Sequence, residues 1–236
     1  MSSDWQQPLE SESGSLFQFP GGLCFFGKKP ASIERLKADF PQISFTRIKQ
    51  VHKDGLCQSN IGDDLSKEAD AHFSEQKNHG LCIATADCAP VFLFCENLRM
   101  VAGIHAGWRG VAQRIVPKTI QHFIAQGAQV KKILIFLGPH IQQPSFEVGL
   151  DVRDQILKSV HTPAGNFSQM IGTEKARVDL HRVLISQIRE FALPDENTIL
   201  LKRDTFSDTA YHSFRRDKES SGRQLSFLSK VDMSKV

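Results

Sequence analysis

One cysteine and two histidines stand where apolar segments of this sequence end. His52 closes residues 43–52 (ISFTRIKQVH), and His105 lies at the end of residues 100–107 (MVAGIHAG). Cys88 lies in TADCAP, where Asp87 and Pro90 interrupt the apolar run 80–95. Loops gather at strand ends, and binding and catalytic residues are disproportionately found on them. We therefore examine these three side chains together.

A thiol and two imidazoles suit a catalytic zinc ion, because three protein ligands leave the fourth position open for water or substrate. The metal would ionise the thiol and move the pKa of bound water toward about 7. Without metal, an imidazole would lower the pKa of the Cys88 thiol and make it a nucleophile. His52, Cys88 and His105 are therefore candidate metal ligands and candidate catalytic residues.

Less specific interpretations compete with this one. A free cysteine usually behaves as a small buried hydrophobe, and a histidine at a strand end is more often a hydrogen-bonded structural residue. A fourth protein ligand, such as Asp87 or His140, would make the metal site structural rather than catalytic.

Several other polar residues are candidates for binding an anion. Arg109 falls in the first turn of an expected helix, where the helix dipole disfavours a cation unless an anion is bound nearby. His140 and Glu147 lie in GPHIQQPSFEVG (residues 138–149), and three arginines lie in SFRRDKESSGR: Arg215, Arg216 and Arg223. The structural alternative is a salt bridge for Arg109 and turn architecture for His140 and Glu147. For the three C-terminal arginines it is a solvated charged face.

The apolar patterns predict interleaved strands and helices. Two strands flank a turn in residues 16–26, residues 43–52 form a strand running into His52, and the nearly apolar runs 80–95 and 99–107 form strands buried on both faces. Further strands are expected at 131–138, 197–203 and 223–228, and helices at 30–40 (beginning at Pro30), 108–127, 148–160 and 178–193. This order favours an α/β (α+β) fold in which mixed sheets pack as a sandwich with flanking helices.

Composition limits the class of protein. The length of 236 residues suggests a single domain, which we expect over 15–236. Residues 1–14 are polar and acidic, and we expect them to form a disordered leader. The formal charge of +3 is too small to indicate a nucleic-acid or membrane partner. The start of the chain lacks the pattern of a signal peptide, and five cysteines without framework spacing suit a reducing cytoplasm.

Taken together, five stretches resemble the bacterial laccase-domain family, which is also labelled polyphenol oxidase and purine nucleoside phosphorylase. They are QVH, TADCAPVFLF, AGIHAGWRG, GPHIQQPSFEVG and SFRRDKESSGR, between about His52 and Leu228. The resemblance implies an α/β sandwich and a metal site at His52, Cys88 and His105 that binds zinc, or copper in the oxidase account. It also implies phosphorolysis of adenosine, inosine and methylthioadenosine, and deamination of adenosine.

The residues themselves help to choose among these chemistries. Multicopper oxidases need repeated H-x-H ligand pairs, and this sequence contains none. We therefore expect a zinc-dependent purine-nucleoside enzyme in which Arg109, Arg215 and Arg216 hold phosphate and His140 contributes to the same cleft. The alternatives are a cysteine-type amide hydrolase acting on a cell-wall precursor, a copper-dependent polyphenol oxidase, and a non-enzymatic binding module.

Overall fold

Two six-stranded sheets and one three-stranded sheet form the framework of the computed structural model, which describes residues 6–161 and 166–231. The first sheet has the order β1 (Leu9–Glu10), β2 (Gly14–Phe19), β3 (Gly22–Gly27), β15 (Gln224–Lys230), β7 (His79–Thr85), β4 (Ser44–Arg47). The second has the order β14 (Thr198–Leu200), β10 (Ile133–Leu137), β8 (Ala89–Cys95), β9 (Met100–Ala106), β6 (Ala71–Ser74), β5 (Leu56–Gln58). The small sheet has the order β11 (Glu147–Gly149), β13 (Lys175–Val178), β12 (Ser168–Ile171).

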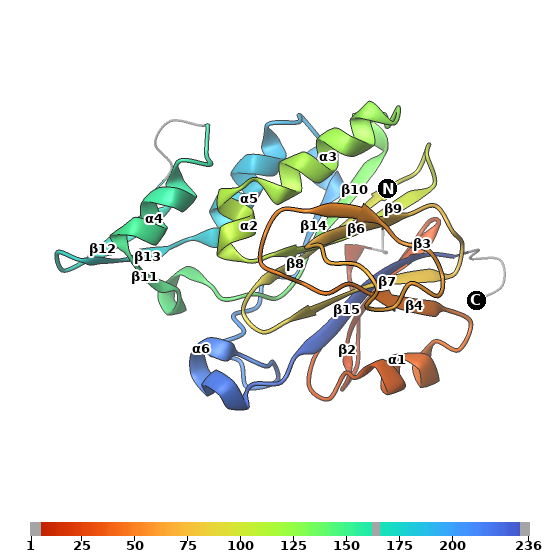
Figure 1. The fold of residues 1–236 in the computed structure, drawn as a ribbon, viewed down its shortest axis with the longest axis horizontal. Helices are drawn as coiled ribbons and strands as arrows, with labels where there is room; N and C mark the ends of the chain where they lie inside the picture. Colours follow the sequence, from red (N-terminus) through yellow and green to blue (C-terminus); the bar gives the residue numbers. More distant parts are fainter. Residues whose placement is uncertain (1–5, 162–165, 232–236) are drawn as a thin grey trace.

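Helices lie outside the two large sheets (Figure 1). They are α1 (Ile33–Asp39), α2 (Trp108–Ala112), α3 (Ile115–Ala125), α4 (Leu150–Leu157), α5 (Leu180–Arg189) and α6 (Phe214–Asp217). Short 3₁₀ turns occupy Val130–Lys132, Gln143–Ser145, Asp195–Asn197 and Lys218–Ser220. The helix α4 and the small sheet project together from one end of the molecule (Figure 1).

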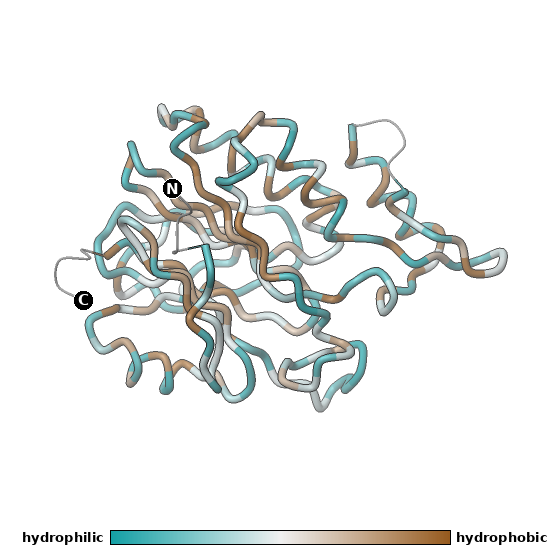
Figure 2. The backbone as a smooth tube through the Cα atoms, turned by 180° about the vertical axis from the view of Figure 1, so that it is seen from behind, coloured by the Kyte–Doolittle hydropathy of each residue, from teal (hydrophilic) through white to brown (hydrophobic). Residues whose placement is uncertain are grey.

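The core is layered. Phenylalanines of β2 and β3 meet those of β8 and β10 between the two large sheets, including Phe17 against Phe136 and Phe26 against Phe92. The other face of the second sheet packs on α3 and α5, and α1 covers the first sheet. Figure 2 shows the apolar residues running along the central strands. The predicted sandwich of mixed sheets with flanking helices is confirmed.

The strand β8 begins directly after Cys88, the strand β9 contains His105, and both strands are buried along their whole length, as their apolar sequences predict. They pair antiparallel, with Ala89 opposite Ala106 and Pro90 opposite His105. This register brings the start of β8 and the end of β9 to the same edge of the sheet.

Several predicted boundaries are wrong. The helix expected over 178–193 covers Leu180–Arg189, and the strand expected over 197–203 covers Thr198–Leu200. The strand predicted to reach His52 ends at Arg47, and His52 lies in a loop with φ +57°. The expected helix 108–127 breaks at Arg114, whose φ is +63° and whose guanidinium donates to Ser159 and Glu190. The first helix begins at Ile33 rather than at Pro30, because the Ser32 hydroxyl caps it by accepting the N–H of Arg35.

The expected leader overlaps an ordered strand. Of residues 1–14, residues 1–5 lie outside the described part of the chain, and the rest include β1, which pairs with β2. The short strands β5, β6, β11, β12 and β13 were also not predicted. Strands of three or four residues offer too few alternating positions to be recognised from periodicity.

Three buried imidazoles predict loss of stability in mild acid. Burial lowers the pKa of His72 to about 3 and the pKa values of His79 and His140 to about 4, from an ordinary 6.5. The unfolded chain therefore takes up these protons first, and stability present above pH 6.5 is lost as the pH falls toward 4. Each imidazole adds a slope on the order of 1.4 kcal/mol per pH unit to the free energy of unfolding.

Urea unfolding at pH 7.5, 6.0 and 5.0 measures this slope. The variant His79→Gln should show a shallower slope because one of the titrating groups is gone. A free energy of unfolding that is constant from pH 7.5 to 5.0 would contradict the prediction.

Candidate metal centre

Three segments bring His52, Cys88 and His105 together. Cys88 lies in the turn between β7 and β8, His105 is the penultimate residue of β9, and His52 comes from the loop between β4 and β5. One donor atom from each side chain lies within 4.8 Å of the others. The two imidazole rings meet edge to face, with centroids 4.8 Å apart. The structure therefore joins the three residues that the sequence singled out.

A buried carboxylate supports both histidines. Asp70, directly before β6, is 0% exposed, and its Oδ1 lies 2.8 Å from Nδ1 of His105. The same carboxylate accepts the backbone N–H groups of Val51, His52 and Lys53. Because a carboxylate only accepts, Nδ1 of His105 carries the proton and Nε2 is left as the ligating atom. The sequence did not point to Asp70, since nothing in its spacing ties it to residues 52 and 105.

The charges of the site favour an ionised thiol. Burial raises the pKa of Cys88, but the charge of His105 and hydrogen bonds from His105 and His52 outweigh it and hold that pKa at about 6. Burial lowers the pKa of His105, but Cys88 and Asp70 raise it to about 9. Without metal, Cys88 and His105 are therefore a thiolate–imidazolium pair at neutral pH, and a bound cation would replace the imidazolium proton.

Gly107 leaves space over the three donors. A Cβ atom placed on this residue would lie 3.1 Å from Sγ of Cys88, 3.5 Å from Cδ2 of His52 and 3.6 Å from Cε1 of His105. The backbone of Gly107 is extended, with φ −69°, so the conformation does not itself require glycine. The open space and the donor set of one thiolate and two imidazoles fit a metal ion of the zinc or copper type.

A second buried carboxylate fixes the turn that holds Cys88. Asp87 has φ +85°, and its side chain accepts the Thr205 hydroxyl at 2.8 Å and the backbone N–H of Arg215 at 2.6 Å. The backbone carbonyl of Asp87 accepts the N–H of Ile141. Segments around residues 141, 205 and 215 therefore meet beside Cys88.

Comparison with known proteins identifies the family. A family model described as multi-copper polyphenol oxidoreductase laccase matches residues 31–230. The chain belongs to this laccase-domain family. A purine nucleoside phosphorylase of Synechocystis is 32% identical over 201 residues, covering 75% of this chain and 76% of that protein. The purine nucleoside phosphorylase YfiH of Escherichia coli is 31% identical over 183 residues, covering 77% and 72%.

Solved structures show the same fold. YlmD from Geobacillus stearothermophilus superposes with a TM-score of 0.84 at 19% identity, covering 95% of this chain and 98% of that one. A Bacillus licheniformis protein titled hypothetical protein YfiH gives 0.84 at 20% identity, covering 94% and 98%. The resemblance to the laccase-domain family is thus confirmed. The names of the relatives do not favour the predicted alternative of an amide hydrolase.

The guanidinium of Arg216, a predicted phosphate ligand, forms its hydrogen bonds within the surrounding loop. Its guanidinium donates to the backbone carbonyls of Thr205, Phe206 and Tyr211 and, through Nε and Nη2, to the carboxylate of Asp217. These bonds use all five of its N–H groups. We therefore propose a structural role for Arg216 in place of phosphate binding.

Arg109 and Arg215 have donors to spare. Among the residues that the structure describes, the guanidinium of Arg215 gives one hydrogen bond, from Nη1 to the carbonyl of Glu147, and it lies 5.8 Å from the centre of the Phe146 ring. The guanidinium of Arg109 lies 4.5 Å from the centre of the Trp108 ring. Both side chains thus remain candidates for binding an anion.

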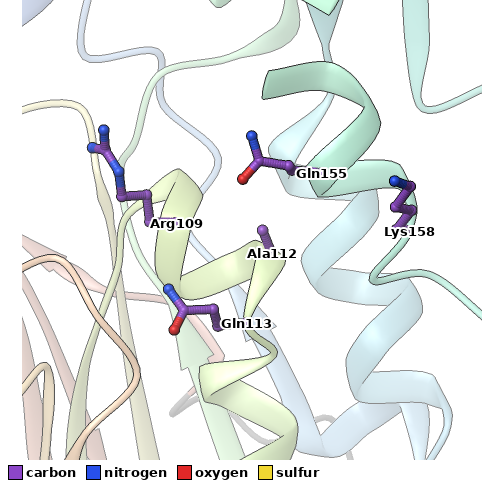
Figure 3. Close-up of a pocket in the computed structure, with 5 residues that line it drawn as sticks. All are labelled: Arg109, Ala112, Gln113, Gln155 and Lys158. Atoms are coloured by element: carbon purple, nitrogen blue, oxygen red, sulfur yellow. The ribbon is translucent and has the colours of Figure 1, made fainter. Parts of the chain in front are cut away.

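Arg109 lines a hollow of about 340 Å³ between α2 and α4. Figure 3 shows Arg109, Ala112 and Gln113 on the α2 side and Gln155 and Lys158 on the α4 side. Two of these side chains are cationic and two are carboxamides. Within residues 6–161 and 166–231, neither Arg109 nor Lys158 forms an ion pair.

His140 lies inside the protein. It is 0% exposed, its Nδ1 bonds the carbonyl of Gly138 at 2.8 Å, and its ring stacks on that of His181 at 5.5 Å. Its backbone is linked to the turn of Cys88 through Ile141, whose N–H donates to the carbonyl of Asp87, and through Thr205, which donates its N–H to the carbonyl of His140 and its hydroxyl to Asp87. Glu147 forms an ion pair with Lys175, and Arg223 donates to nearby carbonyls of its own loop. Arg223 matches its structural alternative of a solvated charge, whereas Glu147 belongs to strand β11 and an ion pair rather than to a turn.

The sequence also contained no indication of Thr205, whose hydroxyl donates to Asp87 across a separation of 118 residues.

No helix in the described part of the chain is long and apolar enough to cross a bilayer.

Proposed function

We propose that this chain is a zinc-dependent purine nucleoside phosphorylase that also deaminates adenosine, with His52, Cys88 and His105 holding the metal. The observation that carries the proposal is the convergence of three donor atoms within 4.8 Å beneath the open face of Gly107. The names of the Synechocystis and E. coli relatives support the substrate class.

Zinc bound there would act as a Lewis acid toward the reacting nucleoside or its co-substrate. The protein's own residues would hold the zinc ligands in place. Cys88 contributes a thiolate because its pKa is about 6, and Asp70 bonds Nδ1 of His105, so that Nε2 is the atom left to bind metal. Asp87 keeps Cys88 and the backbone of Arg215 together. These contacts fix the donors before substrate arrives, which reduces the entropic cost of reaching the reactive geometry.

In phosphorolysis, the glycosidic C1′–N9 bond breaks, a phosphate oxygen bonds C1′, and the base leaves with a proton. We propose that Arg109 and Arg215 bind the phosphate, since within residues 6–161 and 166–231 both guanidinium groups have N–H groups without an acceptor. Arginine presents a planar fork of donors that matches phosphate oxygens. In deamination, water adds at C6 of adenosine and ammonia leaves, so no phosphate is consumed.

The test is a nucleoside assay with zinc-loaded protein. Adenosine, inosine and methylthioadenosine are incubated with and without inorganic phosphate, and products are separated by chromatography. We expect free base only when phosphate is present, and inosine from adenosine in either case. Oxidation of a catechol by copper-loaded protein is measured in parallel, as a test of the alternative oxidase function. Failure to release base from all three nucleosides would refute the phosphorylase assignment, and phenol oxidation by the copper form alone would favour the oxidase.

A further inference from the structure

We propose that Asp70 is the positioning residue of the metal centre, setting the affinity of the site for metal by holding both histidine ligands. The proposal rests on the metal site proposed above. It concerns metal binding and is therefore independent of which nucleoside reaction follows.

The carboxylate of Asp70 is fully used. Oδ1 accepts the N–H of His52 at 2.9 Å and Nδ1–H of His105 at 2.8 Å. Oδ2 accepts the N–H of Lys53 at 2.7 Å and that of Val51 at 3.3 Å. An ionised carboxylate offers about four acceptor positions, so these four bonds exhaust it.

The loop that carries His52 is folded around this carboxylate. His52 has φ +57°, a left-handed conformation that is unfavourable for a residue with a side chain. Three successive N–H groups, from residues 51 to 53, converge on the one acidic side chain. Hydrogen bonds to a charged acceptor are about twice as strong as neutral ones, so they offset the strain. Loss of the charge should release the loop and with it the imidazole of His52.

His105 depends on the same residue in two ways. Its ring donates to the carboxylate, and its backbone N–H donates to the carbonyl oxygen of Asp70 at 2.7 Å. The ring bond selects the tautomer and fixes the plane of the imidazole. A carboxylate behind a ligating histidine also makes the ring more basic toward metal. One buried side chain therefore orients two of the three ligands, which are 53 residues apart.

The test compares Asp70→Asn with the unmodified chain. The amide keeps the shape of the side chain but turns one acceptor into a donor that must face an N–H group. Zinc affinity is measured by competition with a chromogenic chelator, and the visible spectrum of the cobalt-loaded protein at saturation reports ligand geometry. We expect zinc affinity to fall by about 10- to 100-fold, the usual cost of losing an outer carboxylate. The thiolate–cobalt band should change in position or intensity.

Asp64→Asn is the matched control. The Asp64 carboxylate also accepts a backbone N–H, that of Arg47, and pairs with its guanidinium, but it contacts no ligand of the site. Its zinc affinity and cobalt spectrum should match those of the unmodified chain. If Asp70→Asn fails to fold, Asp70→Glu, which keeps the charge and shifts it by one methylene, is measured in the same way and should also bind zinc more weakly.

Zinc affinity within twofold of the unmodified chain, with an unchanged cobalt spectrum, would overturn the proposal. A normal zinc affinity in the unmodified chain without nucleoside turnover would instead refute the proposed function and leave the role of Asp70 standing. Absence of zinc binding by the unmodified chain would remove the metal centre and this inference together.

Discussion

Replacing Cys88 by serine should abolish metal-dependent activity while leaving the fold intact. Serine preserves the shape of the side chain, but its hydroxyl does not ionise near neutral pH, whereas the pKa of the Cys88 thiol is held at about 6. The variant therefore lacks the anionic ligand of the site. Since losing a supporting contact alone costs about 10- to 100-fold in metal affinity or activity, losing a ligand should cost more than about 100-fold in each. Zinc content and phosphate-dependent base release measure the two effects.

Cys57→Ser is the matched control for this experiment. Cys57 is a partly buried thiol on β5, and burial raises its pKa, so it remains protonated at neutral pH. This variant should retain full zinc content and full activity. A Cys88→Ser protein that keeps both would show that the thiol is not a ligand.

The second large effect is expected from a single methyl group. In Gly107→Ala, the added Cβ would stand 3.1 Å from Sγ of Cys88 and within 3.6 Å of both imidazoles, beside the donor atoms of the proposed metal site. The φ of −69° suits alanine, so folding should be preserved. We expect at least a tenfold loss of zinc affinity and a larger loss of turnover, because a displacement of about 1 Å at a reacting centre can cost on the order of 100-fold.

Gly55→Ala tests whether any added methyl group near the loop has this effect. Gly55 lies three residues beyond His52, and a Cβ there would have its nearest neighbour 3.9 Å away. Zinc binding and turnover should be unchanged in this variant. Equal zinc affinity in Gly107→Ala and the unmodified chain would mean that the space over the three donors is not used.

The part of the site that the sequence predicted rests on strong local patterns. The apolar runs of β8 and β9 are continuous, so two buried strands could be inferred, and antiparallel pairing of neighbouring strands places residues 88 and 105 at one edge. His52 was grouped with these two residues because it was expected at the end of a strand, although the strand ends at Arg47 and His52 lies in a loop. The resemblance to the laccase-domain family implied the same three residues.

What could not be predicted depends on hydrogen bonds between distant segments. The loop of His52 is shaped by a carboxylate 18 residues further on, and the turn of Cys88 by Thr205 and the backbone of Arg215. The sequence predicted phosphate binding by Arg216 because the partners that occupy its guanidinium are mostly backbone carbonyls, which every residue carries. His140 could be placed near the site, but its stacking on His181 inside the protein follows from tertiary packing alone.

Stepwise addition of zinc to metal-stripped protein tests the central claim most directly. The measured quantity is the rate of phosphate-dependent release of hypoxanthine from inosine at each ratio of zinc to chain. The three-ligand site beneath Gly107 predicts that the rate rises in proportion to zinc and levels off at one ion per chain. A rate that is already maximal in the stripped protein, or that never rises on addition of zinc, would contradict a zinc-dependent phosphorylase centred on His52, Cys88 and His105.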